Sequence, residues 1–279
     1  MQYKTNERSD SAFHFIETPL YQKLITLLKA KVRLILIVGP SGCGKTETSL
    51  QALRDHFSVN PQMISGNKVF NTEGLLGARG FRNGEVVYDY GQLVQQLFQD
   101  SGAIVLDEMF QIGLDKLTTL LQLRSERSHF VHPDTGESIR IPENFAIIGT
   151  SNREAVDLAC RRDSETALAL FDGLETVLAP PLSRSQVKAI IHSHIGECNE
   201  VEAAEAMRLY DELSEALESQ GKEPLSVRAA IAAAKNLASG MSGAFVEELL
   251  RNRFLPIKDL HQALELRSQF DTKNSTKSE

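Results

Sequence analysis

The sequence predicts an α/β domain, in which helices cover both faces of a parallel β-sheet, followed by a small all-helical domain. Two short apolar runs, 35–38 and 103–106, are typical of buried parallel strands, because each is too short for a buried helix. The first run leads into a glycine-rich turn and the second into two acidic residues, as at the ligand-binding edge of such sheets. After Pro180 and Pro181 the pattern is that of amphipathic helices.

The composition narrows the class of protein. Of the 279 residues, 42% are hydrophobic, which is enough for a substantial core and for more than one domain. The formal charge of −7 disfavours general binding to nucleic acid, without excluding a local basic patch. Three distant cysteines do not predict a disulfide framework, and neither a signal peptide nor a membrane span is expected. We therefore expect a cytoplasmic protein with no membrane partner.

We expect four segments along the chain. Residues 1–13 are polar and are predicted to be flexible, and residues 14–181 are predicted to form the α/β domain. Residues 182–270 are predicted to form the helical domain, and residues 271–279 a disordered tail.

The first helix is predicted to begin at Thr18 and Pro19, an N-cap and a first-turn proline. Phe15 and Ile16, just before it, are candidates for a wall that faces a bound base, or for ordinary core packing. Residues 66–91 form a polar, glycine-punctuated insertion without clear periodicity. A loop of this length is usually functional or disordered.

The first apolar run leads into G-x-x-x-x-G-K-T, the pattern of a phosphate-binding loop. Its glycines let backbone N–H groups approach phosphate oxygens, and the following helix points its positive end at them. Lys45 is predicted to contact the β- and γ-phosphates of ATP, and the Thr46 hydroxyl to bind Mg²⁺. The predicted nucleotide-binding residues of this loop are Gly39, Pro40, Ser41, Gly42, Cys43, Gly44, Lys45 and Thr46.

The second apolar run ends in Asp107 and Glu108, roughly 60 residues after the loop. In an enzyme with such a loop, Asp107 would hold Mg²⁺ and Glu108 would orient and activate the attacking water. Alone, the pair would be a weak signal, since an aspartate can equally cap a helix. After a phosphate-binding loop it predicts hydrolysis of ATP.

A third strand, 145–152, ends in Asn152, whose amide would be placed to touch the γ-phosphate or the attacking water. Before it, residues 129–141 predict a hairpin around a Pro-Asp-Thr-Gly turn. His129 and His132 have a spacing that could suit a metal, but a strand would point them to opposite faces.

Helices are predicted for the remaining segments. One is expected through Leu114, Leu117 and Leu121, and another follows the basic pair Arg161 and Arg162. A short strand, 176–179, is expected to close the domain. The helical domain carries apolar stripes with these members: Val187, Ile190, Ile191; Ala206, Tyr210, Leu213, Leu217; Val227, Ile231, Ala234; and Leu249, Leu250, Leu260, Leu264.

Together, GPSGCGKT, AIVLDE, IIGTSN, the hairpin-bearing insertion and the helical second domain resemble the AAA+ ATPases. Within them the chain resembles the group of the MoxR and CbbQ/NorQ ATPases, the chelatase ATPase subunits, the McrB restriction motor and dynein. The run TGESIRIPENFAIIGTSN is similar to the MoxR and CbbQ/NorQ pattern, and the P-loop helix is similar to that of dynein. The resemblance covers roughly residues 14–265.

The resemblance implies roles for particular residues. Lys45 and Thr46 would hold phosphate and magnesium, Asp107 and Glu108 would be the Walker B acids, and Asn152 the first sensor. Arg228, in the run Leu-Ser-Val-Arg, would be the second sensor, although a solvent-facing arginine explains it without the family context.

The sequence departs from the group at one position. The group has an arginine finger before the last strand, where this chain has Gly173. Arg161 and Arg162 are the nearest substitutes, or else a solvated basic pair. If neither serves, hydrolysis by a homo-oligomer would be slow, because a finger contributes about 10³–10⁵ in rate in P-loop enzymes.

The resemblance implies a ring-forming ATPase, most often a homohexamer, that remodels a protein client or partner subunit. The alternatives are a nucleic-acid-linked motor of a restriction or defence system, and the ATPase subunit of a metal chelatase. Arg140 and Phe130 are the basic and aromatic residues that the predicted hairpin would offer to nucleic acid, which makes that alternative less favoured.

Overall fold

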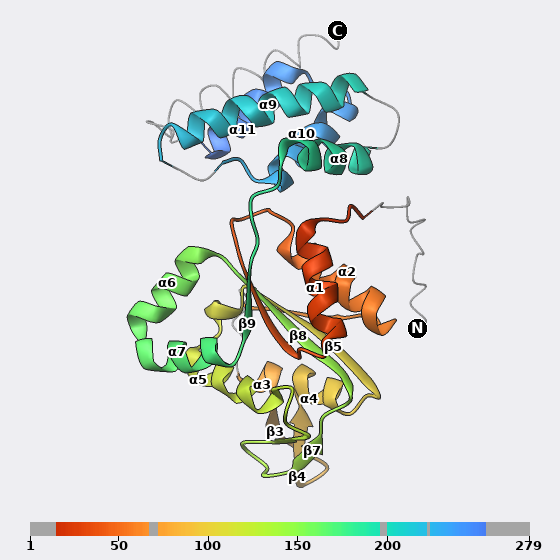
Figure 1. Cartoon of the computed structure of the whole chain (residues 1–279), viewed down its shortest axis with the longest axis vertical. Coiled ribbons are helices and arrows are strands. Elements are labelled where there is room, and N and C mark those ends of the chain that lie inside the picture. Colours follow the sequence, from red (N-terminus) through yellow and green to blue (C-terminus); the bar gives the residue numbers. More distant parts are fainter. Residues whose placement is uncertain (1–14, 67–71, 196–199, 222–223, 255–279) are drawn as a thin grey trace. The chain divides into compact units, whose positions relative to one another are not determined.

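The computed structural model describes residues 15–66, 72–195, 200–221 and 224–254 (Figure 1). The chain divides into two compact units: the first is Glu17–Pro181, and the second comprises the residues from Leu182 onward together with Phe15 and Ile16. The predicted flexible segment 1–13, the predicted tail 271–279, and Leu260 and Leu264 of the predicted helical domain lie outside the described residues.

The first unit is built on a five-stranded sheet, and all its strands are parallel. Val38 pairs in register with Ser151 on one side and with Leu178 on the other, so three strands end at the same edge. The sheet has the strand order β2 (Gln62–Ser65), β5 (Ser101–Asp107), β8 (Asn144–Ser151), β1 (Leu34–Val38) and β9 (Glu175–Leu178).

Helices cover both faces of this sheet, as the sequence predicts (Figure 1). Leu34 and Leu36 point into the core on one face, while Ile35 and Ile37 are buried on the other, which explains why the whole run is apolar. Thr18 caps the first helix, since its hydroxyl accepts from the Tyr21 N–H at 3.3 Å. One side carries α1 (Pro19–Lys29) and α2 (Lys45–Phe57); the other carries α3 (Thr72–Leu75), α4 (Gln92–Leu97), α5 (Leu114–Leu117), α6 (Arg153–Arg162) and α7 (Ser164–Asp172).

Two hairpins extend from this unit. The predicted hairpin is confirmed as β6 (His129–Val131) and β7 (Ser138–Arg140). The expectation of an irregular loop within 66–91 is wrong, because β3 (Gly77–Arg82) and β4 (Glu85–Tyr90) pair in antiparallel fashion. The tight turn between them is Asn83–Gly84, with φ values of 52° and 86°, as a two-residue hairpin turn requires.

The helix predicted through Leu114, Leu117 and Leu121 is also corrected. α5 is a single α-helical turn that continues into the 3₁₀-helix η2 (Thr118–Leu123). A shorter 3₁₀-helix, η1 (Met109–Gln111), precedes α5. The buried residues are Leu117, Leu120 and Leu123, which recur every three residues. That is the period of a 3₁₀-helix, in which positions i and i+3 share one side.

The described part of the second unit is helical. Its core is made largely of alanine, leucine and valine side chains on α8 (Arg184–Ile195), α9 (Glu200–Glu218), α10 (Val227–Ala238) and α11 (Gly243–Phe254). Arg208 on α9 pairs with Glu205, Glu212 and Glu247, the last of which lies on α11. Among the residues described, no helix combines the length and apolar character needed to span a bilayer.

Candidate active site

Residues 39–44 form a tight loop that connects β1 to α2. Gly42 and Gly44 have φ values of 74° and 83°, in the left-handed region that favours glycine. Gly39 lies against the backbone after β9, since a Cβ there would approach the Ala179 carbonyl oxygen to 2.6 Å. The α2 helix begins at Lys45, so its N-terminal N–H groups and the positive end of its dipole face this loop.

The Lys45 side chain folds back over the loop. Its ammonium donates to the carbonyl oxygens of Gly39 at 2.9 Å and Pro40 at 2.7 Å. The ammonium is thus held within the loop whose backbone would surround a phosphate group. This arrangement places a full positive charge beside the helix N-terminus, as phosphate binding requires.

Thr46 and Asp107 meet at the carboxyl edge of the sheet. The Thr46 hydroxyl donates to Asp107 Oδ1 at 2.6 Å, so the start of α2 is joined to the end of β5. Both groups offer hard oxygen atoms, which fit Mg²⁺. Within the described chain no three His, Cys, Asp or Glu side chains cluster, but Mg²⁺ needs one or two carboxylates beside substrate phosphates.

Thr150 on β8 contacts both Asp107 and Glu108. The sequence analysis did not predict these contacts. Its hydroxyl donates to Asp107 Oδ1 at 2.7 Å and accepts from the Glu108 backbone N–H at 3.2 Å. The side chain is 1% exposed. The signal in the sequence was weak, because a threonine within an apolar strand is also a common β-sheet residue.

Glu108 has an unusual backbone conformation, with φ 53° and ψ 47°. A non-glycine residue here is strained and is held by its surroundings. Its carbonyl turns toward Gly66 at the end of β2, where a Cβ would lie 2.4 Å from the carbonyl oxygen. The Glu108 carboxylate accepts from Gln111 Nε2 at 2.6 Å, a second contact that the prediction missed.

The Asn152 side chain has a structural role in this geometry. Its Oδ1 atom accepts from the Ala155 N–H at 2.7 Å and so caps α6. The amide NH₂ group is the part of the side chain that would be left for a phosphate or a water molecule. The predicted role of Asn152 as a sensor stays a prediction.

The arginines predicted to act on the nucleotide lie far from the phosphate-binding loop in the sequence. Arg161 and Arg162 are exposed in the last turn of α6. Arg228 is exposed in the first turn of α10, in the helical unit, and its role as a second sensor also stays a prediction. At Gly173, a Cβ would lie 2.7 Å from Nη2 of Arg124, so the Arg124 guanidinium fills the space beside this glycine.

Comparison with protein families agrees with this geometry. Residues 34–172 match the family model of the AAA domain, dynein-related subfamily. This part of the chain is an AAA domain. The match confirms the predicted fold class and supports the predicted membership of the AAA+ ATPases. No curated protein matches the chain.

The two hairpins of the AAA domain are joined through His132, which is fully buried. Its Nδ1 atom accepts from the N–H groups of Asp134 and Thr135, so the proton is on Nε2, which donates to the Leu76 carbonyl at 3.2 Å. Both ring nitrogens therefore have partners within the protein. The Tyr88 ring packs edge-on against this imidazole, with centroids 4.9 Å apart.

Two tyrosines of β4 strengthen this junction. The Tyr88 hydroxyl donates to Asp134 at 2.8 Å, and the Tyr90 hydroxyl donates to Glu137. Burial, followed by the hydrogen bond to Asp134, raises the pKa of Tyr88 to about 12. The hydrogen bond to Glu137, followed by burial, raises the pKa of Tyr90. We call β3–β4 and β6–β7, joined in this way, the paired hairpins.

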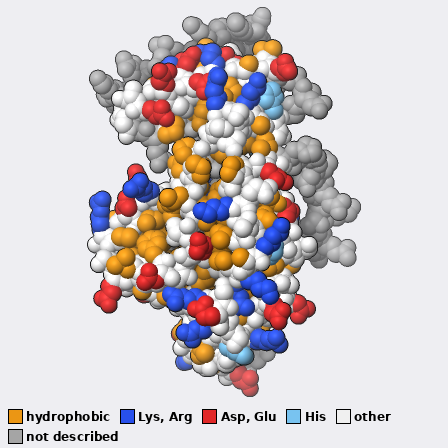
Figure 2. All heavy atoms as spheres, in the orientation of Figure 1, with side chains coloured by type: hydrophobic (Ala, Val, Ile, Leu, Met, Phe, Trp, Pro, Cys, Tyr) orange, Lys and Arg blue, Asp and Glu red, His pale blue; other side chains and the backbone are white. Residues whose placement is uncertain are grey.

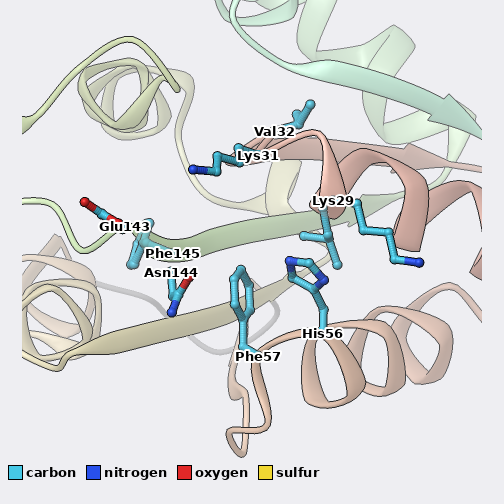
Figure 3. Close-up of a pocket in the computed structure, with 9 residues that line it drawn as sticks. Lys29, Lys31, Val32, His56, Phe57, Glu143, Asn144 and Phe145 are labelled. Atoms are coloured by element: carbon cyan, nitrogen blue, oxygen red, sulfur yellow. The ribbon is translucent and has the colours of Figure 1, made fainter.

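A cavity of about 240 Å³ opens at the opposite edge of the AAA domain's sheet (Figure 3). The rings of His56 and Phe57 extend from the end of α2 toward the start of β8. Burial, and then the charge of Lys29, lowers the pKa of His56. The buried lining side chains, Leu28 and Phe145, are apolar, so no buried polar group in the lining would select a ligand.

Proposed function

We propose that this protein hydrolyses ATP with Mg²⁺, assembles as a ring and remodels a protein partner, as MoxR and CbbQ-like ATPases do. The observation that carries the ATPase part is the contact between Thr46 and Asp107, with Glu108 next to it. It unites the phosphate-binding loop and the acidic strand end in one site, although the two lie about 60 residues apart.

Each residue of this site has a distinct task in the proposal. Lys45 supplies fixed positive charge to the β- and γ-phosphates, and Thr46 and Asp107 would hold Mg²⁺, which neutralises charge on the transferred phosphoryl group. Glu108 accepts a proton from the attacking water. Asn152 would orient that water or the γ-phosphate through its amide.

Two substitutions test the ATPase proposal. Lys45→Ala should abolish binding of ATP, because the ammonium is the full charge that the loop contributes to the phosphates. Glu108→Gln should keep ATP bound and stop turnover, since an amide cannot take a proton from water. Binding is measured by calorimetry and turnover by phosphate release. Unchanged nucleotide affinity in Lys45→Ala, or normal turnover in Glu108→Gln, would contradict the proposal.

The surface of α6 and α7 supports assembly. Figure 2 shows hydrophobic side chains gathered over these helices. Leu158 and Leu168 are 48% and 63% exposed, and Leu158 precedes Arg161 and Arg162 by three and four residues, so these three share one helix face. An apolar surface that also carries cations suits contact with a neighbouring subunit and its nucleotide.

Assembly is tested with the Glu108→Gln variant in the presence of Mg²⁺ and ATP. We expect a closed ring, most often a hexamer, because ATP would lie between subunits. Mass photometry measures the species directly, and Leu158→Glu is the matched variant that should stay monomeric. A monomer of Glu108→Gln at micromolar concentration would contradict ring formation.

The paired hairpins are the proposed site of contact with the protein partner. Phe81 and Val86 face each other across the turn of β3–β4 and are 73% and 69% exposed. A rigid, apolar tip of this kind suits a protein surface better than solvent. Deletion of the turn at Asn83 and Gly84 should therefore keep ATP binding and uncouple it from the partner.

A nucleic-acid-linked motor is the second candidate, and exposed side chains of the β3–β4 hairpin favour it. Phe130 is fully buried and so cannot serve as an aromatic platform, contrary to the expectation above. Phe81 can, because it is exposed and shares a strand with the exposed Arg79 and Arg82. ATP hydrolysis that is stimulated by DNA or RNA in a salt-sensitive way would favour this candidate over a protein remodeller.

A further inference from the structure

We propose that Thr150 is a positioning residue, which fixes the magnesium-holding carboxylate of Asp107 and the backbone of Glu108 in one arrangement. The inference rests on the proposed ATPase function and assigns a task to a residue outside the predicted site. Thr150 itself would not touch the nucleotide. It would act through the two acids.

This inference rests on the two hydrogen bonds that the Thr150 hydroxyl makes. A threonine hydroxyl has one proton to donate, and Thr150 gives it to Asp107 Oδ1 at 2.7 Å. A lone pair of the same oxygen accepts the Glu108 N–H at 3.2 Å. Both acids are thus tied to β8, which pairs with β5 on one side and with β1 on the other.

The same carboxylate oxygen also accepts from Thr46 at 2.6 Å. Asp107 Oδ1 therefore lies between two hydroxyl donors, one at the start of α2 and one on β8. Donors on both sides fix the rotation of the carboxylate. If the Thr150 hydroxyl is removed, Asp107 is held from one side alone, and its orientation toward Mg²⁺ is less defined.

The effect on Glu108 is separate. Its left-handed backbone is strained, and the N–H bond to Thr150 is one of the contacts that hold it. Without this acceptor the segment can relax toward an ordinary conformation, which would move the Glu108 carboxylate away from its place. Loss of one hydroxyl should therefore reduce both Mg²⁺-dependent binding and the chemical step.

The test compares Thr150→Val, which keeps the shape and removes the hydroxyl, with Thr150→Ser, which keeps the hydroxyl. The first readout is binding of a fluorescent ATP analogue over a range of Mg²⁺ concentrations. In Thr150→Val the Mg²⁺ concentration for half-maximal enhancement of binding should rise roughly tenfold, because a hydrogen bond to a charged group is lost. Binding of the analogue in EDTA should stay within about twofold of the wild type.

The second readout is turnover at saturating Mg²⁺ and ATP. It should fall roughly tenfold or more in Thr150→Val, and Thr150→Ser should restore both readouts to near the wild type. Ser151→Ala is the matched control. It removes a similarly buried hydroxyl from the same strand, one that donates to the Asn152 carbonyl and not to either acid.

Three outcomes would overturn the inference. A wild-type Mg²⁺ dependence in Thr150→Val would do so, as would an equal loss in Ser151→Ala, which would indicate general damage to β8. If wild-type protein shows no Mg²⁺-dependent nucleotide binding, the proposed function fails and the inference with it. If the wild type binds and hydrolyses ATP and Thr150→Val is unaffected, the inference alone fails.

Discussion

At the scale of single residues, the site depends on a strained glutamate and on a glycine that makes room for it. Glu108 has φ 53°, and its carbonyl turns toward Gly66, where a Cβ would lie 2.4 Å from the oxygen. A contact this short is repulsive, so residue 66 has to lack a side chain for Glu108 to keep its conformation. The position of Glu108, the proposed base, is thus set by the residue that follows the neighbouring strand β2.

We expect Gly66→Ala to impair hydrolysis more than nucleotide binding. The added methyl group would push against the Glu108 backbone, while the loop 39–46 is untouched. Overpacking of this kind costs about 1–3 kcal/mol of stability, and displacement of the base should lower single-turnover hydrolysis about tenfold or more. Single-turnover rates and affinity for a fluorescent ATP analogue measure the two effects. Equal losses in both would contradict this account.

At the residue scale, the sequence allows the proximity of side chains to be predicted where the pattern is local, whereas the roles of these residues stay predictions. Lys45 and Thr46 belong to one contiguous pattern, and the structure brings Thr46 to Asp107 because the acid ends a parallel strand. Thr150 and Gln111 were missed because their partners are defined by strand register and by the turn after β5. No periodicity in the sequence encodes those contacts.

At the scale of elements, the paired hairpins are joined because β4 and the β6–β7 turn share polar contacts. Tyr88 and Tyr90 lie on the same side of β4 and reach Asp134 and Glu137, while His132 fills the space between. We therefore expect a displacement of the β3–β4 tip to be passed to β6–β7. The two insertions, 47 residues apart at their Tyr90–Glu137 contact, form a single element.

The contribution of Tyr88 should depend on pH in a defined direction. Its pKa is raised to about 12, so the neutral hydroxyl is favoured in the folded state. The contribution of the Tyr88 hydroxyl to the free energy of unfolding is therefore complete below the ordinary tyrosine pKa of about 10. It is lost as the pH rises through about 12. Tyr88→Phe should cost about 1 kcal/mol, a few degrees in Tm, at pH 8.

The difference in Tm between the wild type and Tyr88→Phe should then shrink between about pH 10 and pH 12. Circular dichroism at a series of pH values measures it. Asp134→Asn keeps an acceptor and removes the charge, so it separates the hydrogen bond from the coulombic effect. A difference that stays constant up to pH 12 would contradict the bond between Tyr88 and Asp134.

Elements were predictable where the apolar period was clear. Strands β1, β5 and β8 and the helices α1 and α2 follow from their patterns, whereas β3–β4 was missed although Asn83–Gly84 is a strong hairpin signal. Its strands contain Gly77 and Gly80 and are largely exposed, so they lack the alternation that marks a half-buried strand.

At the scale of the whole molecule, the fold class was predictable from the sequence. The residue that would serve as the arginine finger was not. Two candidates lie within the AAA domain: the exposed pair Arg161 and Arg162, and Arg124 beside Gly173. The Nε atom of Arg124 is buried and has no hydrogen-bond partner among the described residues. In the proposed ring, the choice between these arginines would depend on contacts with a neighbouring subunit, and such contacts are not encoded in any local pattern.

We expect replacement of both Arg161 and Arg162 by alanine to lower steady-state hydrolysis at least about tenfold, roughly 1.4 kcal/mol of transition-state stabilisation. Binding of ATP to the isolated subunit should be unchanged, because the pair would act across a subunit boundary. Arg124→Ala is measured in parallel. Brisk hydrolysis that survives the double replacement would remove the pair from consideration, and loss in Arg124→Ala alone would assign the charge to Arg124.

Gly39 of the phosphate-binding loop packs against Ala179, the residue at which the chain leaves the sheet. The Ala179 N–H also donates to the Val38 carbonyl at 2.8 Å, so the two backbones are clamped together. From Ala179 the chain passes directly through Pro180 and Pro181, whose rings restrict rotation and absorb little displacement. A displacement of the loop would therefore move the backbone at Ala179, and the two prolines that follow would absorb little of that movement.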